Sequence, residues 1–438
     1  MDWLSALLML LGLLVGLMAI GVPVAFAFFG VNIVGAVVFL GGEAGLNQLA
    51  RNAMASVTSF TLAPIPLFVA MGEVLFHTGV AARAIEAVDR LISRVPGRLS
   101  VVSVLGGTLF SSLSGSTLAN TAVLGGLLLP DMLRRGYHPS MAMGPIMATG
   151  GIAMLIPPSA LAVLLGSLAG ISISKLLIAG IIPGLMMSAL FLAYVVGRCA
   201  AQPSLAPSYA VERLTLWQRW KPFVVYVVPL FAIFAVVVGS ILFGLATPTE
   251  SAAVGCVASI IAAAAYRSLT VKALVAAFRE TAKVAVMILF IIVASVTFSQ
   301  ILAFSGATDG LLRAIEATGT GKIAALVLML AILLFLGAFT DQVSMIMITI
   351  PFFIPLAGQL AIDLLWLGVL MLIAMEISFT TPPFGLLLYV MKAVAPPQIT
   401  LRQIYVAALP FIVLEVIVLA LLVAWPGLAT WLPLVVGR

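Results

Sequence analysis

Ala148-Thr-Gly-Gly-Ile-Ala-Met-Leu-Ile-Pro-Pro-Ser159 decides the fold, because it breaks a long apolar segment with two glycines and a double proline. A second apolar segment is broken in the same way by Thr381-Pro-Pro-Phe384. The prolines of the two copies correspond at a constant offset: Pro23, Pro130, Pro157 and Pro158 with Pro248, Pro355, Pro382 and Pro383. Duplicated and interrupted hydrophobic segments indicate a secondary transporter with its site at the repeat interface. In the alternative, the prolines only kink the helices of a duplicated membrane protein.

The composition indicates a membrane protein. Of the 438 residues, 63% are hydrophobic and only 8% are charged, whereas roughly a quarter of the residues of a soluble domain are charged. Cys199 and Cys256 form neither a disulfide framework nor a metal motif. His77 and His138 are too far apart for an HExxH motif, and no GxSxG occurs. We therefore expect a protein that is not an enzyme.

Apolar runs of about 20 residues, the length of a membrane span, divide equally between the two copies. The first copy predicts helices near 4–20, 23–40, 59–77, 140–170 and 174–198. The second copy predicts helices near 222–242, 248–266, 284–304, 366–392 and 403–432. Segments 79–98 and 268–283 mix charged and apolar residues at helical spacing, which is typical of interfacial helices.

Basic residues orient these spans, since cytoplasmic loops are rich in Lys and Arg. One face would carry most of the basic residues, in the loops around 83–98, 134–135, 198–221, 267–283 and 392–402. The other face would carry only Arg51, Lys175, Arg313, Lys322 and Arg438. Both termini are then periplasmic. Because each copy has an odd number of spans, five, the second copy is inverted relative to the first.

Two further apolar regions, 99–133 and 322–357, are interrupted by polar residues. In each, the arms of about 13–15 residues are too short to cross a bilayer. Re-entrant helical hairpins would place Ser111–Ser116 and Gly337–Asp341 at tips inside the membrane, where Thr340 or Asp341 would cap the returning helix. The alternative is two ordinary kinked spans in place of the hairpins.

Each break frees backbone carbonyls, which together with hydroxyl groups suit a hard cation such as Na⁺. Helices should restart at Pro157 and Pro382, because proline fits the first helical turn. The expected first Na⁺ site comprises Ser112, Ser114, Gly115, Ser116, Gly151 and Pro157. The expected second site comprises Gly337, Thr340, Asp341, Ser378 and Thr381. Positive helix ends attract anions, so the expected substrate contacts are Ser116, Asn120, Ser159 and Thr380.

Several motifs together resemble one transporter family. They are Phe110-Ser-Ser-Leu-Ser-Gly-Ser-Thr-Leu-Ala-Asn120, Leu129-Pro-Asp-Met-Leu-Arg-Arg-Gly-Tyr137, Gly180-Ile-Ile-Pro-Gly184 and Ala246-Thr-Pro-Thr-Glu-Ser251, with the two double-proline stretches. This set, which spans nearly the whole chain, resembles the large membrane subunit of tripartite ATP-independent periplasmic (TRAP) transporters. In Ser378-Phe-Thr-Thr381 the chain departs from the glycine that the family usually has before Thr-Pro-Pro.

The resemblance implies a Na⁺-driven importer in the bacterial inner membrane that takes a small organic anion, such as sialic acid or a C4-dicarboxylate. Its implied partners are a periplasmic substrate-binding protein and a small four-helix membrane subunit. The implied architecture is an elevator like those of the ion transporter superfamily. A channel fits poorly with two inequivalent inverted halves. A stand-alone Na⁺- or H⁺-coupled carboxylate transporter without a binding protein is the closer alternative.

An elevator needs a scaffold and a moving transport domain. We expect scaffold helices in 1–57 and 222–283. The transport domain would comprise 58–198, with hairpin 99–135 and broken helix 140–170, and 284–438, with hairpin 322–357 and broken helix 366–392. Residues 199–221 would form a cytoplasmic linker between the two halves.

The charge distribution predicts that reporters fused to either terminus are translocated. Alkaline phosphatase fused at residue 1 or after residue 438 should be active, and a fluorescent protein that folds only in the cytoplasm should stay dark. A cytoplasmic C-terminus would contradict the five-plus-five inversion.

Overall fold

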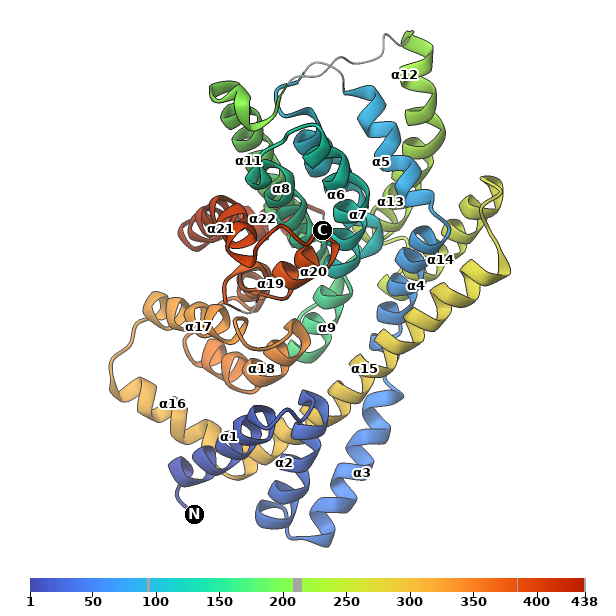
Figure 1. The fold of residues 1–438 in the computed structure, drawn as a ribbon. Coiled ribbons are helices and arrows are strands. Elements are labelled where there is room, and N and C mark those ends of the chain that lie inside the picture. The colour runs from blue at the N-terminus through green and yellow to red at the C-terminus, as the bar shows by residue number, and fades with distance from the viewer. Residues whose placement is uncertain (93–94, 208–214, 384, 437–438) are drawn as a thin grey trace.

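The computed structural model describes residues 1–92, 95–207, 215–383 and 385–436, apart from the side chains of 112–114. Within these ranges the chain is helical and has no strand (Figure 1). Seven of the helical stretches are long and apolar enough to cross a membrane: Phe60–His77, Ile173–Ala201, Leu216–Leu242, Pro248–Ala265, Val271–Phe304, Gln342–Gln359 and Leu401–Ala424. The expected all-α membrane class is confirmed, whereas the inversion of the repeats stays a prediction.

The first half of the chain supplies the elements up to α11. They are α1 (Trp3–Ala19), α2 (Val24–Phe39), α3 (Glu43–Val57), η1 (Phe60–Leu62), α4 (Pro64–His77), α5 (Val80–Leu91), α6 (Arg98–Ser114), α7 (Thr117–Arg134), α8 (Pro139–Gly151), η2 (Ile152–Met154), α9 (Ala160–Ala169), α10 (Ile173–Ala179) and α11 (Ile181–Ala201).

The second half supplies the remaining elements. They are η3 (Pro203–Leu205), α12 (Leu216–Pro222), η4 (Phe223–Val227), α13 (Val228–Leu242), α14 (Pro248–Ala265), α15 (Val271–Phe304), α16 (Ala307–Ala317), α17 (Lys322–Leu336), α18 (Gln342–Gln359), α19 (Leu364–Thr380), α20 (Leu386–Val394), α21 (Leu401–Ala424) and α22 (Gly427–Val436). Part of the expected linker, 208–214, lies outside the described residues.

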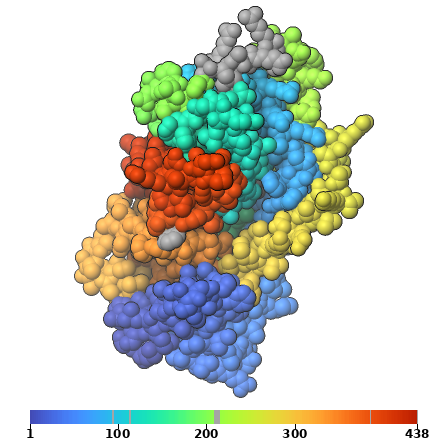
Figure 2. Space-filling model, in the orientation of Figure 1, coloured from blue at the N-terminus to red at the C-terminus, as the bar shows by residue number. Residues whose placement is uncertain are grey.

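The interrupted helices α8 and α19 lie at the centre of the packing. Every residue of Met141–Gly151 and of Trp366–Thr380 is buried. Helices α6, α7 and α21 pack on α8, and α17, α18 and α21 pack on α19. The long α15 runs diagonally along one side, against α2, α3 and α4 (Figure 1). Figure 2 shows the N-terminal helices gathered at one end of the molecule.

Two helices differ from the sequence-based expectation: α15 is longer than predicted, and α3, which packs on it, was not predicted. The expected interfacial helix at 268–283 and the span at 284–304 are one continuous helix, Val271–Phe304. No glycine or proline occurs within it, so nothing interrupts its hydrogen bonds. The polar helix α3 has no counterpart among the expected spans. It is fixed to α15 by Asn52, whose amide donates to Gln300 Oε1 at 2.7 Å.

Each of the two regions forms two helices joined by a turn, and three of the four arms are longer than the predicted 13–15 residues. Helices α6, α7, α17 and α18 contain 17, 18, 15 and 18 residues. The first tip needs only Gly115 and Ser116, because α6 continues through the serines that we expected to form the turn. At 1.5 Å per residue, the longer arms approach the thickness of a bilayer core, so arm length does not itself establish re-entry.

Glycines let the connection between α10 and α11 press against the first break. A Cβ on Gly180 would collide with the backbone oxygen of Leu155, and one on Gly184 would lie 2.6 Å from Ile156 Cγ1. This contact explains both glycines of the Gly180–Gly184 motif. It also holds the irregular backbone after η2 inside the protein, as a bilayer requires.

Gly180→Ala should therefore destabilise the protein. Since the Leu155 carbonyl belongs to the backbone and cannot rotate away, we expect a loss of ~1–3 kcal/mol, typical of overpacking. Thermal unfolding in detergent would show it as a lower midpoint. Gly197→Ala is the matched control, because a Cβ at that position of α11 meets nothing within 4 Å. An equally stable Gly180→Ala would contradict the packing described.

Candidate functional site

The first break lies between α8 and α9. The α-helix ends at Gly151, a short 3₁₀ turn follows, and α9 begins at Ala160. Ser159 caps α9, since its Oγ accepts from the Ala162 amide at 3.1 Å. The expectation that a helix restarts at Pro157 is wrong, because the serine, a strong N-cap residue, sets the start beyond both prolines.

The second break lies between α19 and α20. Helix α19 ends at Thr380 and α20 begins at Leu386, so the expected restart at Pro382 is also wrong. A Cβ on Gly385 would lie 2.7 Å from the Phe379 oxygen and 2.8 Å from the Thr381 oxygen. The chain therefore folds back over the end of α19 before helix resumes, and the absent side chain at Gly385 permits this approach. Phe384 lies outside the described residues.

The tip of the first hairpin meets the first break. Gly115 has a left-handed backbone with φ of 57°, and a Cβ there would lie 2.9 Å from the Pro158 oxygen. Ser116 caps α7 by accepting from the Ala119 amide at 3.3 Å. The expected ligands Ser112 and Ser114 lie at the end of α6, but their side chains are outside the described set.

The tip of the second hairpin meets the end of α19, before the second break. Gly337 lies directly against Ser378, whose hydroxyl would overlap a Cβ at that position. Asp341 caps α18, as the sequence predicted: its Oδ1 accepts from the Val343 amide at 3.0 Å and the Ser344 amide at 3.1 Å. Thr340 donates to the Leu336 carbonyl at 2.9 Å. The structure thus brings each hairpin tip to one interrupted helix.

Hydroxyl groups gather where α19 ends. Ser378 donates to the Met375 carbonyl at 2.7 Å, and Thr380 and Thr381 both donate to the Ile377 carbonyl, at 3.0 and 2.6 Å. Carbonyl and hydroxyl oxygens are ligands for hard cations. The described residues contain no cluster of three or more His, Cys, Asp or Glu side chains. The end of α19 itself thus offers neutral oxygen atoms, and the hairpin tip that meets it adds the carboxyl group of Asp341.

Asn120 was expected to contact the substrate, and the structure shows that its side chain joins helices by hydrogen bonds. It is fully buried, and its Nδ2 donates to Ser111 Oγ at 2.5 Å and to the Thr149 carbonyl at 3.0 Å. Ser111 also donates to the Thr149 carbonyl, at 2.7 Å. These bonds fix both arms of the first hairpin to α8. Of the other expected contacts, Ser159 and Thr380 are also buried.

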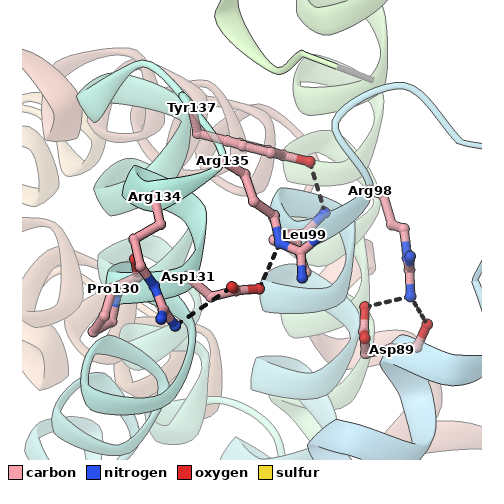
Figure 3. A network of polar contacts seen from close by, with 8 residues as sticks. All are labelled: Asp89, Arg98, Leu99, Pro130, Asp131, Arg134, Arg135 and Tyr137. Atoms are coloured by element: carbon pink, nitrogen blue, oxygen red, sulfur yellow. Dashed lines mark hydrogen bonds and ion pairs between the residues drawn. The ribbon is translucent and has the colours of Figure 1, made fainter. Parts of the chain in front are cut away.

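Ion pairs join the base of the same hairpin to its surroundings (Figure 3). Asp131 of α7 pairs with Arg135, the residue that follows this helix, at 2.7 Å, and Arg98 at the start of α6 pairs with Asp89 of α5 at 2.9 Å. The Tyr137 hydroxyl accepts from a backbone amide of α6 at 3.3 Å. Arg98, one of the arginines that orient the chain in the charge analysis, therefore also fastens the first arm of the hairpin to α5.

Two solved structures share this fold. The YdaH transporter of Alcanivorax borkumensis matches with a TM-score of 0.62 and 16% identity, covering 89% of this chain and 90% of its own. Neisseria gonorrhoeae MtrF matches with a TM-score of 0.60 and 14% identity, covering 87% and 83%. At such low identity these likenesses concern the fold alone.

Other proteins are more similar to this chain in sequence than these two structures are. The chain is 32% identical to the 2,3-diketo-L-gulonate TRAP transporter large permease protein YiaN of Escherichia coli, over 89% of this chain and 90% of the relative. It is 31% identical to the C4-dicarboxylate large permease protein DctM of Pseudomonas aeruginosa, over 85% and 86%. It is 29% identical to the sialic acid large permease protein SiaM of Vibrio cholerae, over 95% and 96%.

The family model described as "Tripartite ATP-independent periplasmic transporter, DctM component" matches residues 11–428. The motifs, the two broken helices and the relatives agree with this match over nearly the whole length. The chain belongs to the DctM component family, the large membrane subunits of tripartite ATP-independent periplasmic transporters.

Proposed function

We propose that this subunit imports a small organic anion, a carboxylate or sugar acid, by Na⁺-coupled secondary transport with an elevator mechanism. Family membership makes it a multi-pass inner-membrane permease whose partners are a small membrane subunit and a periplasmic binding protein. The named substrates of the three relatives above are all organic acids. An acid is accordingly the expected cargo here.

The observation that carries the proposal is the meeting of each hairpin tip with one interrupted helix. Gly115 lies against Pro158, and Gly337 lies against Ser378. A broken helix exposes carbonyl oxygens at the end of its first half and amides at the start of its second half. The carbonyls attract a cation and the amides attract an anion. One pair of this kind in each copy supplies two related cation sites and a place for an anion between them.

The residues proposed for each ligand follow this geometry. The first Na⁺ site would use Ser112, Ser114, Gly115, Ser116, Gly151 and Pro157. The second would use Gly337, Thr340, Asp341, Ser378 and Thr381. The substrate would contact Ser116, Asn120, Ser159 or Thr380. Ser378 contacts Gly337 at the second hairpin tip, and we propose that it contributes its carbonyl or hydroxyl oxygen to the second site.

An elevator requires part of the protein to stay still. Helix α4 packs on α14 and α15, and α15 packs on α2 and α3. The sequence-based division places α4 and the part of α15 after residue 283 in the transport domain. Because of this packing, we propose that these two helices belong to the scaffold instead, while the hairpins, α8, α9, α19 and α20 move with the substrate. Within the scaffold, the fully buried Asn32 donates to the Ala294 carbonyl at 2.6 Å, joining α2 to α15.

Thr381→Ala should weaken the dependence of transport on Na⁺. Removing one hydroxyl from the second site is expected to raise the Na⁺ concentration for half-maximal uptake by about 3–10-fold, equivalent to ~0.6–1.4 kcal/mol. Proteoliposomes holding both membrane subunits, with binding protein and a candidate organic acid outside, would measure it. Because many ligands are carbonyls, uptake should be weakened and not abolished.

Thr349→Ala is the matched control for that variant. Thr349 also donates its hydroxyl to a carbonyl one turn back, that of Met345 at 2.7 Å, but it lies within α18 away from the break. Its Na⁺ dependence should equal that of the wild type. Uptake driven by a proton gradient without Na⁺, or two variants that behave alike, would contradict the assigned site.

Uptake should also require the binding protein. Proteoliposomes with both membrane subunits should accumulate radiolabelled substrate only when the matching binding protein is present, because delivery is proposed to occur from that protein. A binding protein from an unrelated system serves as the control. Equal uptake of free substrate without it would favour the stand-alone carboxylate transporter instead.

A further inference from the structure

Two apolar grooves open on the surface of the protein. The first has a volume of about 420 Å³ and lies between α1, α16 and the hairpin arms α17 and α18. The second, also of about 420 Å³, lies between α5, the hairpin arm α6 and the segment formed by η4 and α13. Figure 1 shows these two groups of helices on opposite sides of the central α8 and α19.

The two grooves occupy equivalent places in the two copies of the chain. Arg83-Ala-Ile-Glu-Ala87 in α5 recurs as Arg313-Ala-Ile-Glu-Ala317 in α16. Each of these helices directly precedes a hairpin, and each packs on the beginning of the opposite copy, α5 on η4 and α16 on α1. A groove thus forms twice, where a hairpin arm and the helix before it meet the opposite copy. Because it recurs, the groove is a property of the fold.

The linings offer water almost no hydrogen-bond partner. Every described residue that lines the second groove is apolar, and the described lining of the first contains only two polar side chains, Thr308 and Thr349. The Thr349 hydroxyl already donates to the Met345 carbonyl. Since an enclosed water needs roughly two to four polar partners, the grooves exclude it. Left empty, their lining atoms would lose van der Waals contacts.

Both grooves are continuous with the apolar outer surface of the protein. At the rim of the first, Val15 and Leu328 are 62% and 50% exposed. At the rim of the second, Val228 and Phe231 are 46% and 57% exposed. Apolar surface of this kind on a multi-pass membrane protein faces hydrocarbon. The medium at the mouth of each groove is therefore lipid.

The helix beside each groove indicates its depth in the membrane. Leu312 and Ile315 of α16 line the first groove, whereas Arg313 and Glu316 of the same helix are exposed. A helix with such a division lies in the membrane interface, with its apolar face about 5–10 Å into the boundary between headgroups and acyl chains. The groove under that apolar face is at the depth where an acyl chain leaves its headgroup.

We propose that each groove holds an acyl chain of a membrane phospholipid, seated between a hairpin arm and the beginning of the opposite copy. An apolar cavity of about 150 Å³ is large enough for benzene, so each groove accommodates a longer stretch of hydrocarbon. Lipid surrounds the whole protein, whereas a protein partner docked at one groove would leave the other open on the far side of the central helices.

The bound chains would lie at the boundary along which the elevator slides. The expected scaffold includes α1 and α13, and the hairpin arms face them across the grooves. A flexible chain fills this space without fixing the hairpin to the scaffold. This role in movement rests on the proposed function, whereas the two lipid sites do not.

Photocrosslinking of the full-length chain with its small subunit tests both sites. The complex would be placed in nanodiscs of phosphatidylethanolamine and phosphatidylglycerol with a trace of phosphatidylcholine that carries a diazirine in one acyl chain. Mass spectrometry of the digested chain should find the label concentrated in the linings of the two grooves. Labelling spread evenly over the exposed apolar surface, or grooves that crosslink to the small subunit and not to lipid, would overturn the proposal.

Filling each groove should remove its label. Val15→Trp should abolish labelling of the first groove only, and Val228→Trp that of the second only, because the larger side chain occupies the entrance. The matched controls are Leu8→Trp on α1 and Val236→Trp on α13, at residues that are 63% and 55% exposed and line neither groove. An unchanged thermal unfolding midpoint identifies the folded variants, and the labelling pattern of the wild type decides if neither folds. Labelling that survives in both folded variants would contradict the proposal.

Uptake by the same variants tests the role in movement. A tryptophan fixed to α1 or α13 should slow Na⁺-driven uptake and leave the Na⁺ concentration for half-maximal uptake unchanged, since no proposed ion ligand is altered. Unchanged uptake in a variant that has lost its label would overturn this role and leave the lipid sites standing. A wild type whose uptake does not depend on Na⁺ would overturn the proposed function alone.

Discussion

The structure depends on one constraint: inside a bilayer, every backbone amide and carbonyl needs a partner from the protein itself. A helix can be broken there only where other elements enclose the break. Helices α8 and α19 meet this condition, because they are buried throughout their central parts by elements from both halves of the chain. Ser159 satisfies an amide at the start of α9. The breaks are therefore a consequence of where these two helices lie.

The surrounding elements can enclose the two breaks because glycines, which have no side chain, stand at the points of closest contact. Gly115, Gly180, Gly337 and Gly385 each have a neighbour within 3 Å of where a Cβ would stand. Without a hydrophobic force between helices in lipid, close backbone approach supplies the packing energy. Glycine weakens a helix by about 0.5–1 kcal/mol relative to alanine, but here it lets hairpin tips and connections reach the breaks.

The sequence was sufficient for the all-α membrane class, the two helix interruptions and the family, because these follow from apolar length, proline position and ordered motifs. It was insufficient for the helix boundaries, because these depend on which of several neighbouring residues begins or ends the helix. Ser159 rather than Pro157 determines where α9 starts, and the first hairpin turns at Gly115 rather than across the serines. The contact of Glu376 with Gly151 was also hidden, since it depends on the register of two helices that are distant in sequence. No apolar run marks α3, whose place depends on the contact of Asn52 with α15.

The two breaks are consequently not packed independently of one another. Asn120 and Ser111 attach the first hairpin to the Thr149 carbonyl near the end of α8. Two residues further on, Gly151 meets Glu376 of the second half. A hydrogen-bonded and close-packed chain thus leads from the first tip, through the first break, to α19, whose own end carries Ser378 against the second tip. Because packed interiors respond by switching between discrete arrangements and do not deform smoothly, we expect a change at either tip to act on the other through the central helices. The elevator that we propose, in which ions and anion move together, would need that coupling.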